Sequence, residues 1–212
     1  MKTVSFLGTV IAVSAAIFLA QNASAQTITL ESWEGSLDGW TLQAPGWTYA
    51  PSPIGVTDGS YSAALTGTNS PNYGQMLLSP FEASWTAAFG GATSLKLDVF
   101  TFPGSFGNFL QFDIDINNAD TGFVSLDSYS YPATVIGSET MITVPVSPAL
   151  AAILAASTHP TQIAIQIGGG NTPGNQTMYL DNLRVVPEPS TFALLGFGVI
   201  GLVGVARRRR VS

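Results

Sequence analysis

Short runs in which apolar and polar side chains alternate are the feature of this chain that most limits its fold. The runs are separated by clusters of Gly, Pro, Asn and Asp, and they occupy residues 28–31, 61–66, 95–100, 109–116, 141–146, 162–167 and 178–185. A period of two places successive side chains on opposite faces of a strand, and the intervening clusters supply tight turns. The pattern predicts an all-β fold, an antiparallel β-sandwich.

Composition supports short strands over long helices. Charged residues make up 9% of the 212 residues, whereas Gly and Pro number 22 and 13, a mixture typical of many strands joined by turns. One helix is expected at 148–156, with Ser147 as its N-cap and Pro148 in its first turn, and we expect it to close one end of the sandwich.

Because the chain has no cysteine, disulfides, cysteine zinc sites and thiol catalysis are excluded.

Charge is divided unevenly along the chain. All thirteen acids lie between Glu31 and Glu188, where the only bases are Lys96 and Arg184, so that this region carries a balance of −11. A negative surface repels phosphate backbones, and nucleic acid is therefore not an expected partner. Such a surface suits divalent cations or neutral polymers.

The first 25 residues have the three parts of an export signal. Met1 and Lys2 form a positive start, residues 4–20 are apolar, and Ala23-Ser24-Ala25 has the small residues that signal peptidase reads. We expect cleavage by signal peptidase, export through the inner membrane and a mature protein that begins at Gln26. An uncleaved membrane helix is the alternative.

Residues 187–212 have a different three-part order. Pro187-Glu188-Pro189 precedes an apolar stretch at 191–206, which is followed by Arg207, Arg208, Arg209 and Arg210. A helix over 191–206 would span about 24 Å, a little less than the roughly 30 Å hydrocarbon core, and terminal arginines can snorkel to the interface. The positive-inside rule predicts a cytoplasmic C-terminus. With a cleaved leader, the domain at 26–186 would then lie outside.

This tail resembles the PEP-CTERM sorting signal of exopolysaccharide-producing Gram-negative bacteria. The resemblance implies recognition by an exosortase, a membrane-embedded cysteine transpeptidase-like enzyme. It further implies removal of the helix and transfer of the domain to the cell envelope or extracellular matrix. A permanent single-span membrane anchor that contains a chance Pro-Glu-Pro is the alternative.

Three segments of the central region are similar to the opening and closing strands of carbohydrate-binding-module-like jelly rolls. They are Trp33–Trp40, Val56–Ser62 and Tyr179–Val185. The resemblance implies a structural calcium held by Glu34, Asp58 and Asp181, whose oxygens suit a hard cation. The alternative is that Asp58-Gly59 and Asp181-Asn182 are ordinary turn dipeptides and that Glu34 faces solvent.

Aromatic side chains suggest a glycan site, because sugar rings stack on aromatic faces while their hydroxyls bond to polar groups. Trp47, Trp85, Tyr129 and Tyr131 lie in or beside turn-rich segments and are the candidates, whereas Trp40 is expected in the core. Each candidate could equally be an aromatic packed at the edge of the fold.

Signals for catalysis are weak. The single histidine, His159, precedes Pro160 in a polar linker, and residues 168–171 lack the Gly-Lys-Ser/Thr ending of a phosphate loop. Asp113 and Asp115 share one strand face, as a pair of glycosidase carboxyls could, but we interpret them as an outward polar face. The expected function is a non-catalytic surface or matrix protein associated with exopolysaccharide. A secreted carbohydrate-active hydrolase and a protein-protein adhesin are the alternatives.

Overall fold

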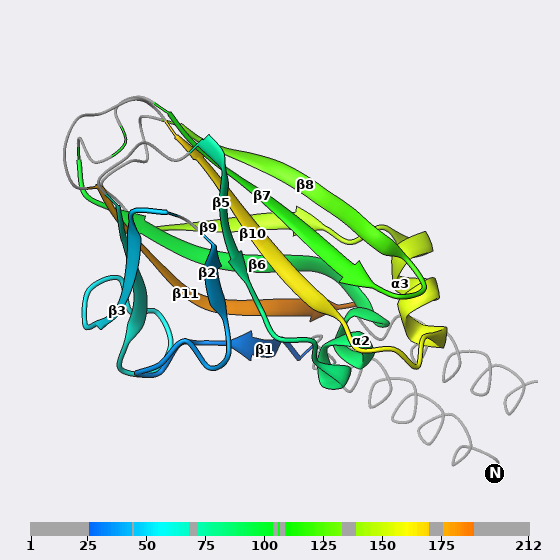
Figure 1. Cartoon of the computed structure of the whole chain (residues 1–212). Coiled ribbons are helices and arrows are strands. Elements are labelled where there is room, and N and C mark those ends of the chain that lie inside the picture. The colour runs from blue at the N-terminus through cyan, green and yellow to red at the C-terminus, as the bar shows by residue number, and fades with distance from the viewer. Residues whose placement is uncertain are drawn as a thin grey trace, which may run out of the picture. The chain divides into compact units, whose positions relative to one another are not determined.

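The computed structural model describes residues 26–43, 45–67, 72–103, 106, 109–132, 139–169 and 176–188 (Figure 1). Two antiparallel sheets stack face to face, and helices lie at one end of the stack. This is the all-β sandwich that the alternating pattern predicts. The compact unit that contains it runs from Thr27 to Pro187.

Sheet A contains six strands in the order β3-β4-β11-β6-β9, with β1 also paired to β11. β4 pairs with the first half of β11 and β1 with the second half, so that both edges of β11 are covered for most of its length. The bounds are β1 Ile28–Glu31, β3 Trp47–Ser52, β4 Ser62–Gly67, β6 Ala92–Thr101, β9 Glu139–Pro145 and β11 Gln176–Pro187.

Sheet B contains five strands in the order β2-β5-β10-β7-β8. Its bounds are β2 Thr41–Gln43, β5 Asn72–Leu78, β7 Phe109–Asn118, β8 Gly122–Pro132 and β10 Gln162–Gly169. β7 and β8 form a long hairpin whose turn includes Gly122 at a positive φ of 67°, a backbone conformation that glycine adopts without a steric penalty.

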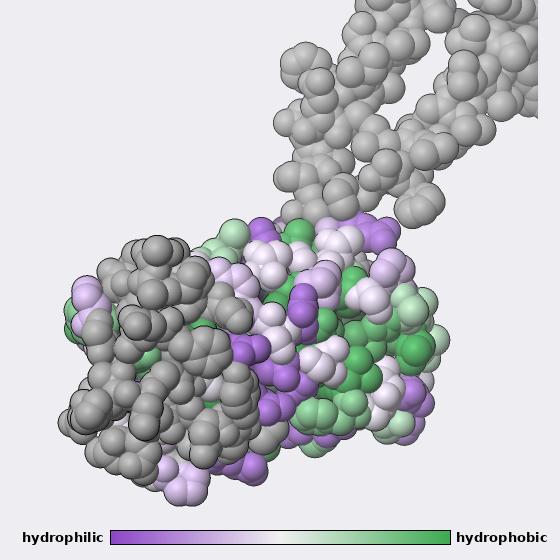
Figure 2. Space-filling model, turned by 90° about the horizontal axis from the view of Figure 1, so that it is seen from above, coloured by the Kyte–Doolittle hydropathy of each residue, from purple (hydrophilic) through white to green (hydrophobic). Residues whose placement is uncertain are grey.

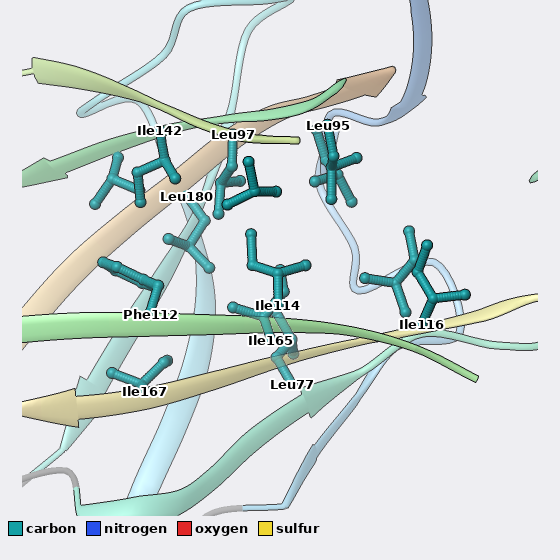
Figure 3. Close-up of a cluster of buried hydrophobic side chains, with 14 of the residues drawn as sticks. Leu77, Leu95, Leu97, Phe112, Ile114, Ile116, Ile142, Ile165, Ile167 and Leu180 are labelled. Atoms are coloured by element: carbon teal, nitrogen blue, oxygen red, sulfur yellow. The ribbon is translucent and has the colours of Figure 1, made fainter. Parts of the chain in front are cut away.

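The core lies between the two sheets and is built by the alternation seen in the sequence. In β7 the side chains of Phe112, Ile114 and Ile116 are buried, and they face apolar side chains of sheet A such as Leu97 and Leu180 (Figure 3). The intervening β7 residues therefore point to the outer face of sheet B. One strand thus carries apolar side chains toward the core and polar side chains toward the outer face of the sheet.

Two helices lie at one end of the sandwich (Figure 1). α3 covers Pro148–Ala156, and the Ser147 hydroxyl accepts a hydrogen bond from the Leu150 N–H at 3.2 Å, which confirms the predicted helix and its cap. α2, at Ala83–Phe89, packs beside α3 and was not predicted from the sequence. Its Trp85 ring packs on Trp40 at 5.8 Å between centroids, and Trp40 packs on Trp33 at 5.4 Å.

The two predicted terminal helices, at 1–25 and 191–206, lie outside the described residues. Among the residues that are described, no helix is long and apolar enough to cross a membrane.

Candidate functional site

The loop between β3 and β4 lies on the outer face of sheet A. Gly55, at a φ of 70°, approaches so closely that an added Cβ would stand 2.8 Å from the Tyr179 side chain and 3.1 Å from that of Phe100. Both aromatic residues point away from the core, because their strand neighbours Leu180 and Val99 are buried inside it. This loop, residues 53–61, is where the acids of the predicted calcium site meet.

Asp181 holds one end of this loop. Its Oδ2 accepts hydrogen bonds from the backbone N–H groups of Thr57 and Asp58 at 2.5 and 2.9 Å, and its Oδ1 accepts from the Asn182 N–H at 2.8 Å. The residue is fully buried, and burial raises the pKa of its carboxyl although these bonds favour the charged form. Asp181 thus fastens the last strand to a loop 123 residues earlier in the chain.

Glu34 holds the other end. Its two carboxylate oxygens accept from the Ser60 N–H at 3.0 and 2.9 Å, and its Oε1 also lies 3.4 Å from the Tyr61 N–H. Gly59 is required here, because its φ is 70° and an added Cβ would stand 1.9 Å from the Glu34 Oε1. We call Glu34, Asp181 and loop 53–61 together the carboxylate clip.

The hydrogen bonds of the carboxylate clip can be compared with what a calcium ion would require of Glu34, Asp58 and Asp181. Glu34 and Asp181 do meet the Asp58 loop, but they are bonded to N–H groups, which point positive hydrogens where a cation would have to lie. The Asp58 side chain takes no part in these bonds, since its backbone N–H is the donor. Within the described part of the chain, no three His, Cys, Asp or Glu side chains form a group that could hold a metal ion. The donor set therefore does not fit the ion that the resemblance implied.

A buried ion pair adjoins the clip. The Arg184 guanidinium donates to both carboxylate oxygens of Asp98, at 2.8 and 3.1 Å, and the Thr57 hydroxyl donates to Asp98 at 2.8 Å. Arg184, one of the two basic residues between Glu31 and Glu188, thus neutralises a carboxylate within the fold. This arrangement explains how Asp98 and Asp181 can lie opposite each other on paired strands, because an arginine and several polar donors offset their charges.

The aromatic candidates lie mostly in the core, which corrects the prediction that their rings are available to a glycan. Trp47 is 7% exposed and Trp85 is 6% exposed; Trp47 packs over Gly67 and Phe106. Tyr129 is half-buried and packs against the core. Tyr131 lies in β8 opposite Leu110, and its side chain is not among those described.

The outer face of sheet B carries a ladder of polar side chains from three adjacent strands, which we call the polar ladder. Its members are Asp113, Asp115 and Asn117 of β7, Gln162 and Gln166 of β10, and Ser125 and Ser128 of β8. Figure 2 shows one face of the molecule, on which hydrophilic side chains cross the middle of the described surface and hydrophobic ones gather to one side of them.

Hydrogen bonds hold the ladder in place. The Ser125 hydroxyl donates to Asp113 at 2.7 Å, the Gln166 amide donates to Asp115 at 2.6 Å, and the Asn117 amide donates to Gln162 at 3.3 Å. Asp115 is only 2% exposed, and burial raises the pKa of its carboxyl, with a further contribution from the negative charge of Asp113. The ladder is therefore a preformed row of donors and acceptors.

Phe123 borders the ladder and was missed by the sequence analysis. It pairs with Asn117 across the β7–β8 hairpin, on the outer face, and its side chain is 54% exposed. A large ring left in solvent beside amides and hydroxyls is what glycan stacking requires. The only available sequence signal was its place directly after Asp120-Thr121-Gly122, a turn that projects the first strand residue outward.

His159 is exposed, as expected of a loop histidine. Its Nε2 lies 4.0 Å from the Asp120 carboxylate, and Asp120 accepts its short hydrogen bond from Ser157 instead. The histidine therefore does not stand between a hydroxyl and a carboxylate, which is the order that a Ser-His-Asp triad needs.

The sorting residues begin in the folded domain. Pro187 is the last residue of β11 and Glu188 follows it directly, exposed to solvent. Pro189 and Arg207, Arg208, Arg209 and Arg210 lie outside the described residues.

Solved structures place the fold among β-sandwich carbohydrate-binding modules. One such module, from a study of promiscuous specificity in the β-sandwich superfamily, aligns with a TM-score of 0.56 and 17% identity over 76% of this chain, which spans 63% of that chain. CBM27-1 of Caldicellulosiruptor saccharolyticus, in complex with mannohexaose, aligns with a TM-score of 0.57 and 19% identity, covering 78% of this chain and 99% of that one.

A third structure gives a similar result. The CBM22-1–GH10 modules of Clostridium thermocellum xylanase 10B, complexed with xylohexaose, align with a TM-score of 0.51 and 12% identity, over 78% of this chain and 29% of that one. At these identities the likeness establishes the fold alone: the domain has a β-sandwich fold similar to that of these modules.

The C-terminal residues identify the chain more narrowly. Residues 185–210 match the PEP-CTERM protein-sorting motif. The chain thus carries a PEP-CTERM sorting motif over these residues, and the motif indicates an exported protein of the envelope or extracellular space. No curated protein matches this sequence.

Proposed function

We propose that this protein is sorted by an exosortase to the cell surface or matrix and there binds polysaccharide, without catalysis, on the outer face of sheet B. The observation that carries the binding proposal is the polar ladder bordered by the exposed ring of Phe123. Sugar hydroxyls would bond to the amides, the serine hydroxyls and the Asp113 carboxylate, while the apolar face of a sugar ring would stack on Phe123.

The geometry favours an extended, neutral polymer. The ladder follows three neighbouring strands across an open sheet face, so that successive sugar units could each meet a different pair of polar side chains. Asp113 and Asp115 add negative charge there, which disfavours an anionic polymer. The likeness to modules solved with mannohexaose and xylohexaose supports the same ligand class.

Binding is favoured over hydrolysis because the two ladder carboxylates already have partners. Asp113 accepts from Ser125 and Asp115 accepts from Gln166, so both are held in place by neighbouring strands. Asp115 is also nearly inaccessible, whereas a general acid must reach the glycosidic oxygen.

The proposal is tested by affinity electrophoresis in gels that contain the polysaccharide of the producing cells, or mannan or xylan. We expect retardation of the protein, and we expect Phe123→Ala to weaken binding by up to about tenfold, since one aromatic contact contributes about 0.5–1.5 kcal/mol. Phe102→Ala is the matched control, because Phe102 is a comparably exposed ring (43%) that packs on Phe100 and Tyr179 of sheet A.

Three results would count against this function. Equal retardation of the wild type and the Phe123→Ala variant would place binding elsewhere. New reducing ends in the polysaccharide would favour the hydrolase. An unshifted band with every polysaccharide would favour the protein-protein adhesin.

A further inference from the structure

The sorting motif overlaps the last strand of the sandwich. The matched residues begin at Val185, whereas β11 and the compact unit continue to Pro187. The boundary of the folded domain therefore falls inside Pro187-Glu188-Pro189. Pro187, the first proline of the motif, is part of the sheet.

The end of β11 is held from both sides. On one side Val186 pairs with Ser94 of β6 and Pro187 pairs with Ala92. The Thr93 hydroxyl donates to the Val186 carbonyl at 3.0 Å. On the other side Val185, which is fully buried, pairs with Ile28 of β1. The backbone groups of Val185 and Val186, at the start of the matched residues, are thus already engaged in the sheet.

An enzyme that cuts a peptide generally binds it extended, through the backbone groups that a strand uses for pairing. Such binding competes directly with β6 and β1 for the end of β11. Pro187 weakens this end, because proline has no N–H to donate and the pairing register shifts between Val186 and Pro187. The strand end can therefore open without unfolding the sandwich.

We propose that the end of β11 is a gate for sorting: Val186 and Pro187 must leave β6 before the sorting enzyme can engage the motif. The inference rests on the proposed exosortase processing and adds a control of its rate. A folded domain with a tightly paired strand end is processed slowly, and one with a frayed end is processed quickly.

A cross-strand disulfide tests the gate, since the chain has no cysteine of its own. Ser94 and Val186 are paired residues with partly exposed side chains on the same face, so the double variant Ser94→Cys/Val186→Cys would lock the strand end. Lys96→Cys/Thr143→Cys is the matched control, because it links β6 to β9 and leaves β11 free.

Processing is followed in pulse-labelled cells that express the full chain, by the shift from the longer to the shorter species. We expect the locked variant to be processed about tenfold more slowly or worse, because the opening step is blocked, and a reductant should restore the rate. Insertion of Gly-Ser-Gly-Ser between Val186 and Pro187 should restore it without reductant, since the motif then lies beyond the lock. The control disulfide should process at the wild-type rate.

The gate and the proposed sorting fail in different ways. If Glu188→Ala is processed like the wild type, the motif does not direct sorting and the proposed function falls. If Glu188→Ala blocks processing but the locked protein matures at the wild-type rate, sorting stands and the gate is wrong. If the locked protein stays slow after the insertion, the defect lies in the fold and the gate is equally wrong.

Discussion

Asp115 has surroundings that its place on a strand does not imply. Alternation puts it on the outer face of sheet B, yet it is 2% exposed, with Gln166 donating to its carboxylate. Burial, and to a lesser extent Asp113, raise its pKa. A group of raised pKa stabilises the fold below its unfolded-state pKa and loses that contribution as the pH rises through its folded-state pKa.

Replacing Asp115 by Asn should therefore stabilise the protein at neutral pH. The amide oxygen can still accept from Gln166, while the cost of a buried charge disappears. The stability gain should be largest at pH 7 and shrink as the pH falls toward about 4, the ordinary range for aspartate. Denaturant unfolding across this pH range measures it.

Asp127→Asn, at an exposed position in β8, is the control for the loss of one charge. The prediction fails if the Asp115→Asn variant is less stable than the wild type at pH 7, or if its gain in stability does not change with pH. Either result would show that burial of the ionised Asp115 carboxylate does not destabilise the fold.

Single side chains also mark where sequence reasoning stops. Alternation placed Asp113 and Asp115 on the outer face, and Trp40 was expected in the core where it lies. The sequence pattern could not show that Trp47 and Trp85 are buried, because a turn-rich segment can place a tryptophan either at the edge of the core or on the surface. The relevant packing partners, Gly67 and Trp40, are distant in sequence.

At the scale of elements, strands with strict alternation could be predicted and irregular ones could not. β7 and β10 were expected from their alternating isoleucines, and α3 from its cap. β2, β3, β5 and β8 were not expected, because they are short or contain Gly or Pro, and their strand conformation depends on partners elsewhere in the sheets. α2 has an ordinary composition and is set by packing against α3.

The carboxylate clip leads to a prediction at this scale. Asp181→Ala removes the acceptor for the Thr57 and Asp58 N–H groups, and unpaired donors of this kind cost about 1–3 kcal/mol. For a domain of this size that lowers the melting temperature by about 2–4 °C per kcal/mol. Asp58→Ala should leave the melting temperature unchanged, because only its backbone is used.

A chelator separates this clip from the calcium that the resemblance implied. We expect the same melting curve with and without chelator, since the clip uses protein donors alone. A melting temperature lowered by chelation in the wild type but not in Asp58→Ala would instead establish a bound ion and overturn the clip.

At the scale of the whole molecule, the first and last strands of the sandwich pair with each other. β1 begins two residues after the predicted mature start at Gln26, and its Ile28 pairs with Val185, two residues before the first proline of the motif. The sequence predicts a signal at each end, but it could not predict that β1 pairs with β11, because strand order is set by long-range contacts. Both predicted processing positions therefore adjoin the same short stretch of sheet A.

The central claim is that both ends are removed signals and that the sandwich between them acts outside the cell. The intact mass of the protein recovered from the cell surface or matrix tests it most directly. We predict a species that begins at Gln26 and ends at or near Pro187-Glu188-Pro189, without the apolar segment and its arginines. Recovery of the uncut 22.1 kDa chain from the cytosol would contradict the account.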